Sequence, residues 1–132
     1  KEYNSNKYVQ ATAFGATSAT MESWLVTPGV TLTTPKKLSF DSATGYYKHA
    51  GLTVWVSTNF DGNKDNLFTS TWTQVSATIA AGPSNGYSDF VNSGDIDLSS
   101  YSGTIYVLFK YIGDNSTNTT TFQIDNVKII DL

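Results

Sequence analysis

The 132-residue sequence contains no cysteine and no arginine, and it has only one histidine. Without cysteine the chain forms no disulfide and offers no thiol for catalysis or metal binding. Its eight basic residues are all lysine and face eleven acidic residues, so it lacks the clusters of positive charge that nucleic-acid binding requires. No apolar run approaches the roughly 18 residues of a membrane-spanning helix. We therefore expect neither a nucleic-acid partner nor a transmembrane segment.

The single histidine, His49, restricts the catalytic schemes that the chain could support. No serine lies in a Gly-x-Ser-x-Gly setting that could use it. A glycosidase would need two facing carboxylates, for which Glu22, Asp41 and Asp125 are the candidates. A hairpin through residues 42–51 would bring His49 and Asp41 together at one end of a sheet, but no third group is spaced to orient the histidine. We therefore predict that the chain is not an enzyme and that His49 is a structural loop residue.

Short segments of alternating polar and apolar residues, rich in aromatic and β-branched side chains, indicate an all-β protein. Turn-forming residues separate these segments. About eight strands at such spacing predict a single antiparallel β-sandwich of jelly-roll type over residues 1–132, with no helix longer than two turns. The predicted strands cover residues 8–14, 23–32, 37–40, 52–58, 71–79, 87–96, 105–111 and 121–130.

Two carboxylates occupy unusual positions in this pattern. Strand side chains alternate between faces, and Trp24 and Val26 predict that Glu22 points inward with them. Val127 and its neighbours at alternate positions predict the same for Asp125. A buried carboxylate needs donors, a cation or a proton. One interpretation is a shared calcium ion bound by Glu22 and Asp125, and the other is backbone N–H donation at a bulge.

The segment 61–66 carries oxygen-bearing side chains at alternate positions, like the first half of a calcium loop. Its glycine is misplaced, and Trp72 stands where a bidentate glutamate would be expected. A second cation between Asp61 and Asp65 and an ordinary polar turn are the two interpretations.

Aromatic residues provide the candidate ligand-binding side chains. Leu52, Val54 and Val56 share the buried positions of one strand, so Trp55 is predicted to face outward. An outward tryptophan can stack on a sugar ring, form a partner interface or be covered by its own chain. Further candidates lie in or beside loops, and they are Tyr46, Tyr47, Trp72 and Tyr87.

Six segments in order resemble the cleaved-adhesin and choice-of-anchor J group of bacterial jelly-roll domains, which is common in Bacteroidetes surface and secreted proteins. Trp72 also matches the tryptophan that follows the variable loop of that group. The six segments are Glu22-Ser-Trp-Leu-Val-Thr-Pro28, Lys37-Leu-Ser-Phe40, Leu52-Thr-Val-Trp-Val-Ser-Thr58, Ile96-Asp-Leu-Ser-Ser-Tyr-Ser-Gly103, Ile105-Tyr-Val-Leu-Phe-Lys-Tyr111 and Ile124-Asp-Asn-Val-Lys-Ile129.

The resemblance implies a jelly roll like that of galactose-binding and carbohydrate-binding modules, secretion or display at the cell surface, and a non-catalytic adhesion role. It implies structural calcium with Glu22 and Asp125 as ligands, and glycans or a surface protein as partners. Anchoring, for example through lipid, would use a segment outside this chain, and the isolated domain is expected to be a monomer. The alternative is a structural spacer or accessory domain without a ligand. Residues 41–43 also fit the short O-glycosylation pattern of these bacteria.

Overall fold

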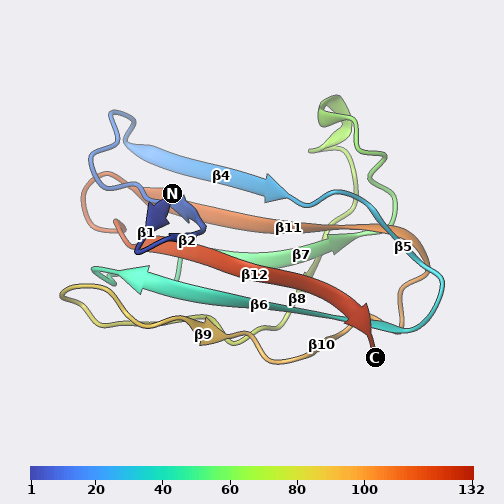
Figure 1. Ribbon diagram of the computed structural model, residues 1–132. Helices are drawn as coiled ribbons and strands as arrows, with labels where there is room; N and C mark the ends of the chain where they lie inside the picture. Colours follow the sequence, from blue (N-terminus) through green and yellow to red (C-terminus); the bar gives the residue numbers. More distant parts are fainter.

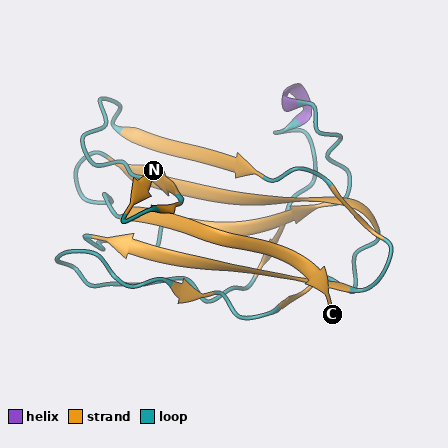
Figure 2. Ribbon diagram, viewed as in Figure 1, coloured by secondary structure: helices purple, strands orange, loops and turns teal.

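The computed structural model describes all residues 1–132 as two antiparallel sheets packed face to face (Figure 1). The only helical segment is a single 3-10 turn, η1 (Lys64–Asn66), in the loop after β7 (Figure 2). No helix is long and apolar enough to cross a membrane. The prediction of an all-β sandwich without long helices is confirmed.

One sheet, which we call the β12 sheet, is built around the long strands β6 and β12. Its members in spatial order are β10 (Ile96–Asp97), β6 (Lys36–Gly45), β12 (Thr121–Asp131) and β3 (Val9–Ala11), and β9 (Val91–Asn92) also pairs with β6.

The other sheet, which we call the β11 sheet, is built around β11. Its members in spatial order are β4 (Thr20–Val26), β11 (Gly103–Asp114), β7 (Leu52–Ser57) and β8 (Thr73–Val75), and β5 (Val30–Leu32) pairs with the first part of β11. A separate hairpin of β1 (Glu2–Tyr3) and β2 (Asn6–Lys7) precedes both sheets.

The order of the strands is that of a jelly roll. Between β3 and β12 the chain passes from one sheet to the other at six of nine connections. The β4–β5 and β9–β10 connections stay in one sheet without joining paired strands, and only the β7–β8 connection joins strands that pair with each other. The first and last strands of the sandwich, β3 and β12, pair with each other in the β12 sheet. The next strands inward along the chain from each end, β4 and β11, pair in the β11 sheet. Two Greek keys nested in this way define the double-sheet jelly roll.

The core lies between the inner faces of the two sheets and follows the period-two alternation of the strands. Phe40 of β6 and Phe109 of β11 meet edge to face across it, with ring centroids 5.0 Å apart. The other large side chains of the core are Leu38, Val54, Val56, Leu98, Ile105, Val107, Tyr111 and Phe122.

Three predicted strands are much shorter than expected, and of residues 8–14 only the three of β3 are in a strand of the sandwich. Residues 71–79 contain only the three residues of β8, and residues 87–96 contain only β9, the start of β10 and an isolated bridge from Tyr87 to Gly45. Glycine, proline and asparagine in residues 82–94 break regular pairing there. The β1–β2 hairpin was not predicted, because its two-residue strands are too short to show alternation.

Candidate functional site

Glu22 lies on the outer face of the β11 sheet and not in the core. Glu22 does share a face of β4 with Trp24 and Val26, as predicted. The face of β4 that points to the core is the other one, because Ser23 on that face lies opposite the buried Tyr111. The Glu22 carboxylate accepts a hydrogen bond from Trp24 Nε1 at 3.0 Å and lies 3.3 Å from Lys110 Nζ. The hydrogen bond from Trp24 is the main cause that holds the pKa of Glu22 below its usual value, and Lys110 lowers it further. The predicted burial of Glu22 was wrong because loop residues cover this outer face and make it look like a core.

Asp125 also points outward, on the β12 sheet. Phe122 and Ile124 point inward from β12, so Asp125 faces solvent beside them. A β-bulge between Asp125 and Lys128 then shifts the register, and Asn126 takes a left-handed conformation with φ of 51°. An extra residue in a bulge inverts the alternation after it. The inward position of Asp125 was predicted by counting back along the strand from Val127. Because the bulge interrupts the alternation between these residues, that prediction was wrong.

The structure does not bring Glu22 and Asp125 together. They lie on the outer faces of opposite sheets, and packed sheets are themselves about 10 Å apart. No group of three or more histidine and acidic side chains is arranged to hold a metal ion. Asp125 instead accepts a hydrogen bond from the backbone N–H of Asn126 at 2.7 Å. The residues do not fit the shared calcium site, and calcium binding stays a prediction of the resemblance.

The Asp61–Asp65 segment is a self-capped turn. The Asp61 carboxylate accepts the backbone N–H of Asn63 at 2.9 Å and the side-chain amide of Asn66 at 2.7 Å. These bonds, that with Asn63 first, lower the pKa of Asp61. The Asn63 side chain in turn accepts the N–H of Asp65 at the start of η1. The turn thus satisfies its own polar groups, and the second cation stays untested.

An aromatic row crosses the outer face of the β11 sheet. Trp24 on β4 lies directly opposite Lys110 on β11, and Trp55 on β7 lies opposite Leu108, two residues before Lys110. The Lys110 ammonium is 5.2 Å from the Trp24 ring centroid and 5.4 Å from the Trp55 ring centroid. The outward position of Trp55 is therefore as predicted. Both rings are half-buried, and the cation–π contacts hold Lys110 between them.

The loop between β7 and β8 completes this face. Phe68 contacts the Trp24 ring edge to face at a centroid distance of 4.8 Å, yet 77% of its surface is exposed. Trp72 lies 6.2 Å from Trp24, and its indole N–H donates to the Leu67 carbonyl at 2.9 Å. Trp55 Nε1 donates to the Thr53 hydroxyl at 2.8 Å. All three indole N–H groups in the chain are thus bonded internally, which fixes the orientation of the rings.

We call Trp24, Trp55, Trp72, Phe68 and Lys110 the aromatic platform. Sequence reasoning identified Trp55 and Trp72 but missed the other three members. The outward position of Lys110 could have been predicted from the sequence. Val107, Phe109 and Tyr111 are inward positions of β11, and Lys110 lies between the last two. The position of Phe68 depends on the path of the loop and has no sequence signal.

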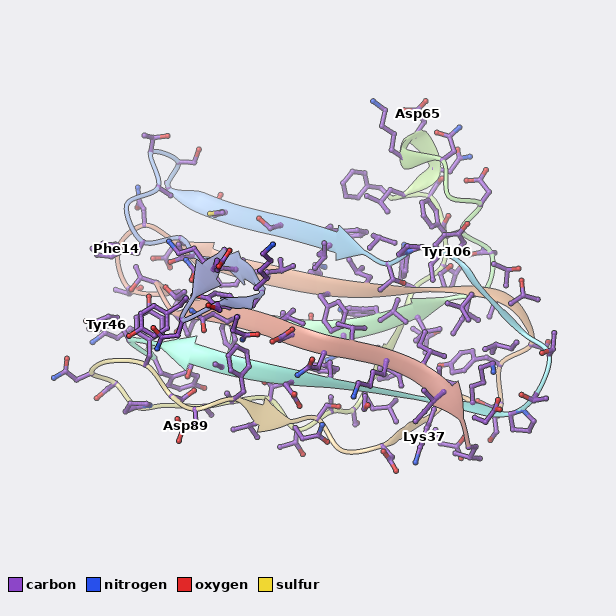
Figure 3. All side chains as sticks on the ribbon, viewed as in Figure 1. Phe14, Lys37, Tyr46, Asp65, Asp89 and Tyr106 are labelled. Carbon is purple, nitrogen blue, oxygen red and sulfur yellow. The ribbon has the colours of Figure 1, made fainter.

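Tyr46 and Tyr47 do not belong to this platform. Tyr46 follows the end of β6 and lies at the opposite end of the sandwich from the η1 turn that bears Asp65 (Figure 3). Its ring contacts Tyr87 edge to face with centroids 5.8 Å apart, and half of its surface is exposed. Tyr47 packs partly against the core. The four predicted ligand-binding residues therefore do not form one surface.

His49 is held within the chain at both ring nitrogens. Nε2 donates to the Ile112 carbonyl at 2.7 Å, and Nδ1 lies 3.0 Å from the Thr120 hydroxyl. That hydroxyl also accepts the backbone N–H groups of Lys48 and His49. Asp41 is on the outer face of β6, which belongs to the other sheet from β7, so no hairpin brings it to His49. His49 is arranged as a structural residue.

The candidate O-glycosylation residue, Ser42, is fully buried. Its hydroxyl accepts the backbone N–H of Ala80 at 2.9 Å. A glycosyltransferase could not reach this oxygen in the folded domain, so the folded structure contradicts modification at residues 41–43.

Solved structures with the same fold include two domains of one bacterial protein, Lys-gingipain. The K1 cleaved adhesin domain of Lys-gingipain from Porphyromonas gingivalis W83 is similar with a TM-score of 0.64 and 24% identity, over 99% of this chain and 78% of that chain. The K3 cleaved adhesin domain of the same protein has a TM-score of 0.60 and 17% identity, over 98% of this chain and 76% of that chain. The resemblance to cleaved-adhesin domains is thus confirmed as a likeness of fold.

At the level of sequence, no curated protein matches the chain. A family model does match, and it covers residues 30–132, which is more than half of the chain. The protein therefore belongs to the family described as Domain of unknown function (DUF5017).

Proposed function

We propose that this chain is a non-catalytic binding module of an exported bacterial protein, that carbohydrate is its ligand, and that the aromatic platform is the binding surface. The observation that carries the proposal is the fixed row Trp24–Lys110–Trp55 with the exposed Phe68 ring beside it. Aromatic rings stack on the apolar faces of sugars, and held side chains bind with little loss of conformational freedom. The Lys110 and Glu22 charges beside the rings can bond sugar hydroxyls.

The likeness to cleaved adhesin domains supports an adhesion role and a location outside the cytoplasm. The arrangement of His49 supports the absence of catalysis, because both ring nitrogens are used in the fold.

A glycan array probed with the purified chain tests the proposal. We expect binding to a subset of glycans that falls at least tenfold in Trp55→Ala and Phe68→Ala. Phe14→Ala is the matched control, because Phe14 has the same exposed fraction as Phe68, 77%, but lies at the other end of the sandwich from the η1 loop (Figure 3). Silence of the wild-type chain on the array would favour the alternative, a structural spacer without a ligand.

A further inference from the structure

We propose a second saccharide-binding site on the opposite outer face, in a cleft beside the β1–β2 hairpin. The cleft has a volume of about 600 Å³, within the range of typical ligand sites. It is lined by Tyr3, Tyr8, Tyr87, Phe90, Gln10 and Gln123, together with smaller polar groups. We call it the hairpin cleft, and its ligand class is an uncharged saccharide.

Two glutamine amides form the floor of the cleft. Gln10 and Gln123 are paired across β3 and β12 on the outer face of the β12 sheet, and only 7% of Gln123 is exposed. Gln123 Nε2 donates to Gln10 Oε1 at 3.0 Å, which orients both amides. The side-chain oxygen Oε1 of Gln123 has no hydrogen-bond partner in the chain, and the side-chain nitrogen Nε2 of Gln10 has none either. Since no buried polar side-chain atom is left unpaired, these two groups are open to the cleft as one acceptor and one donor.

The far wall is aromatic and firmly attached to the sheet. The Tyr87 ring lies against the backbone of Gly45, where an added Cβ would clash with the ring. Ser88 next to it donates its backbone N–H to the Thr44 carbonyl at 2.8 Å, and its hydroxyl accepts the Thr44 N–H at 3.0 Å. These contacts pin the start of the wall to the end of β6.

Phe90 continues the wall and contacts Tyr8 edge to face with centroids 6.0 Å apart. Tyr87, Phe90 and Tyr8 together present aromatic surface to the cleft that the two amides line. Such surface is suited to the apolar face of a sugar ring.

The near wall is the β1–β2 hairpin. Its turn residues Asn4 and Ser5 have φ values of 50° and 65°, as in the tight two-residue turns that match the twist of paired strands. Tyr3 and Asn6 are directly opposite each other and therefore share one face of the hairpin, and both line the cleft. Tyr3 is 70% exposed, so its ring is available to a ligand.

The chemistry of the lining selects the ligand class. No carboxylate lines the cleft, and Lys1 is its only charged residue. Carboxamides can donate to and accept from hydroxyl groups at the same time, and aromatic rings cover C–H surface. This combination of amides and aromatic rings matches an uncharged sugar better than an ion or a wholly apolar molecule.

The hairpin cleft does not depend on the aromatic platform, because the two lie on outer faces of different sheets. A module with one site on each face could engage two glycan chains, or two points of one branched glycan, and so gain avidity. Such an arrangement is suited to adhesion.

A titration with neutral gluco-, galacto- and manno-oligosaccharides, followed by two-dimensional NMR of the full chain, tests the cleft directly. We expect one series to shift the side-chain amide signals of Gln10 and Gln123. The affinity of the chain for that series should fall at least tenfold in Tyr3→Ala and in Gln123→Met. The Tyr3 side chain is exposed, so its removal should not disturb the core. Phe14→Ala and Phe68→Ala should leave these shifts unchanged.

Saccharides that shift only platform signals, with full affinity in Tyr3→Ala, would overturn the cleft and leave the proposed function standing. The absence of any shift with any saccharide would overturn both. Shifts of the Gln10 and Gln123 amides by extended peptides and not by saccharides would overturn the ligand class.

Discussion

Asp41 and Asp125 lie directly opposite each other across the β6–β12 pair, both on the outer face of the β12 sheet. Neither forms an ion pair with a lysine. Asp41 is instead held by the side-chain amides of Asn126 and Asn92, at 2.8 and 2.9 Å, and these bonds, that with Asn126 first, lower its pKa. Like charges directly opposite in a strand pair destabilise the fold.

We therefore expect Asp125→Asn to stabilise the protein by about 0.2–1 kcal/mol at neutral pH, because it removes this repulsion. Urea unfolding measures the change, which should shrink as salt screens the two charges. Asp89→Asn, at an exposed aspartate without an ion pair, is the control for net charge. A melting temperature that falls with chelator in the wild type but not in Asp125→Asn would instead show a structural cation at this pair.

Lys110 should matter more for stability than its ion pair alone would suggest. Each cation–π contact contributes about 0.5–1 kcal/mol, and a surface ion pair between about 0 and 1 kcal/mol. Lys110→Met is therefore expected to cost about 1–2 kcal/mol in denaturant unfolding, whereas Glu22→Gln should cost less than about 1 kcal/mol. Equal effects of the two substitutions would show that the ion pair dominates, and not the cation–π contacts of Lys110 with Trp24 and Trp55.

His49→Ala is expected to reduce stability and leave saccharide affinity unchanged. The substitution removes the hydrogen bonds to Ile112 and Thr120, which together contribute about 1–3 kcal/mol. Thermal unfolding and the oligosaccharide titration measure the two quantities. A loss of turnover on a defined substrate, with the fold intact, would contradict the non-catalytic interpretation.

Gly45→Ala should damage the hairpin cleft selectively. The new methyl group would meet the Tyr87 ring, so the ring must leave its place in the wall. We expect weaker binding of the oligosaccharide that shifts Gln10 and Gln123, with platform binding preserved. Gly94→Ala is a useful comparison, because its methyl group would meet no atom, although its positive φ makes it cost some stability. Unchanged cleft affinity in Gly45→Ala would show that Tyr87 does not contact the ligand.

Asp114 should make the loop before β12 sensitive to acid. Its carboxylate accepts the backbone N–H groups of Asn118, Thr117 and Ser116, which hold its pKa far below the usual value. A lowered folded pKa gives stability that is present above the unfolded value of about 3.9 and is lost as the pH falls through the folded value. Asp114→Asn should therefore melt below the wild type at pH 6, and the gap should narrow towards pH 2. A gap that is constant with pH would exclude the carboxylate charge as its cause.

Sequence reasoning was sound where strands are regular and failed where the chain departs from period two. The inward positions of Leu52, Val54 and Val56 were predicted from alternation alone. The outward positions of Glu22 and Asp125 were not predicted. The outer face that carries Glu22 has apolar residues because loop residues cover it, and the bulge next to Asp125 has no clear signal in the sequence. The hairpin cleft could not be predicted, since it joins residues from β3, β12 and a loop that only the tertiary fold brings together.

The placing of β12 has a consequence for how the domain can be made. This strand follows every strand that it completes, and it pairs with β3 on one side and β6 on the other. Until residues 121–131 are available, β3 has no strand to pair with, β6 is paired only on its other side with β9 and β10, and the core between the sheets is open to water. Pairing between segments so distant in sequence is also slow. The polypeptide should consequently remain unfolded during synthesis until residues 121–131 are available to pair with β3 and β6.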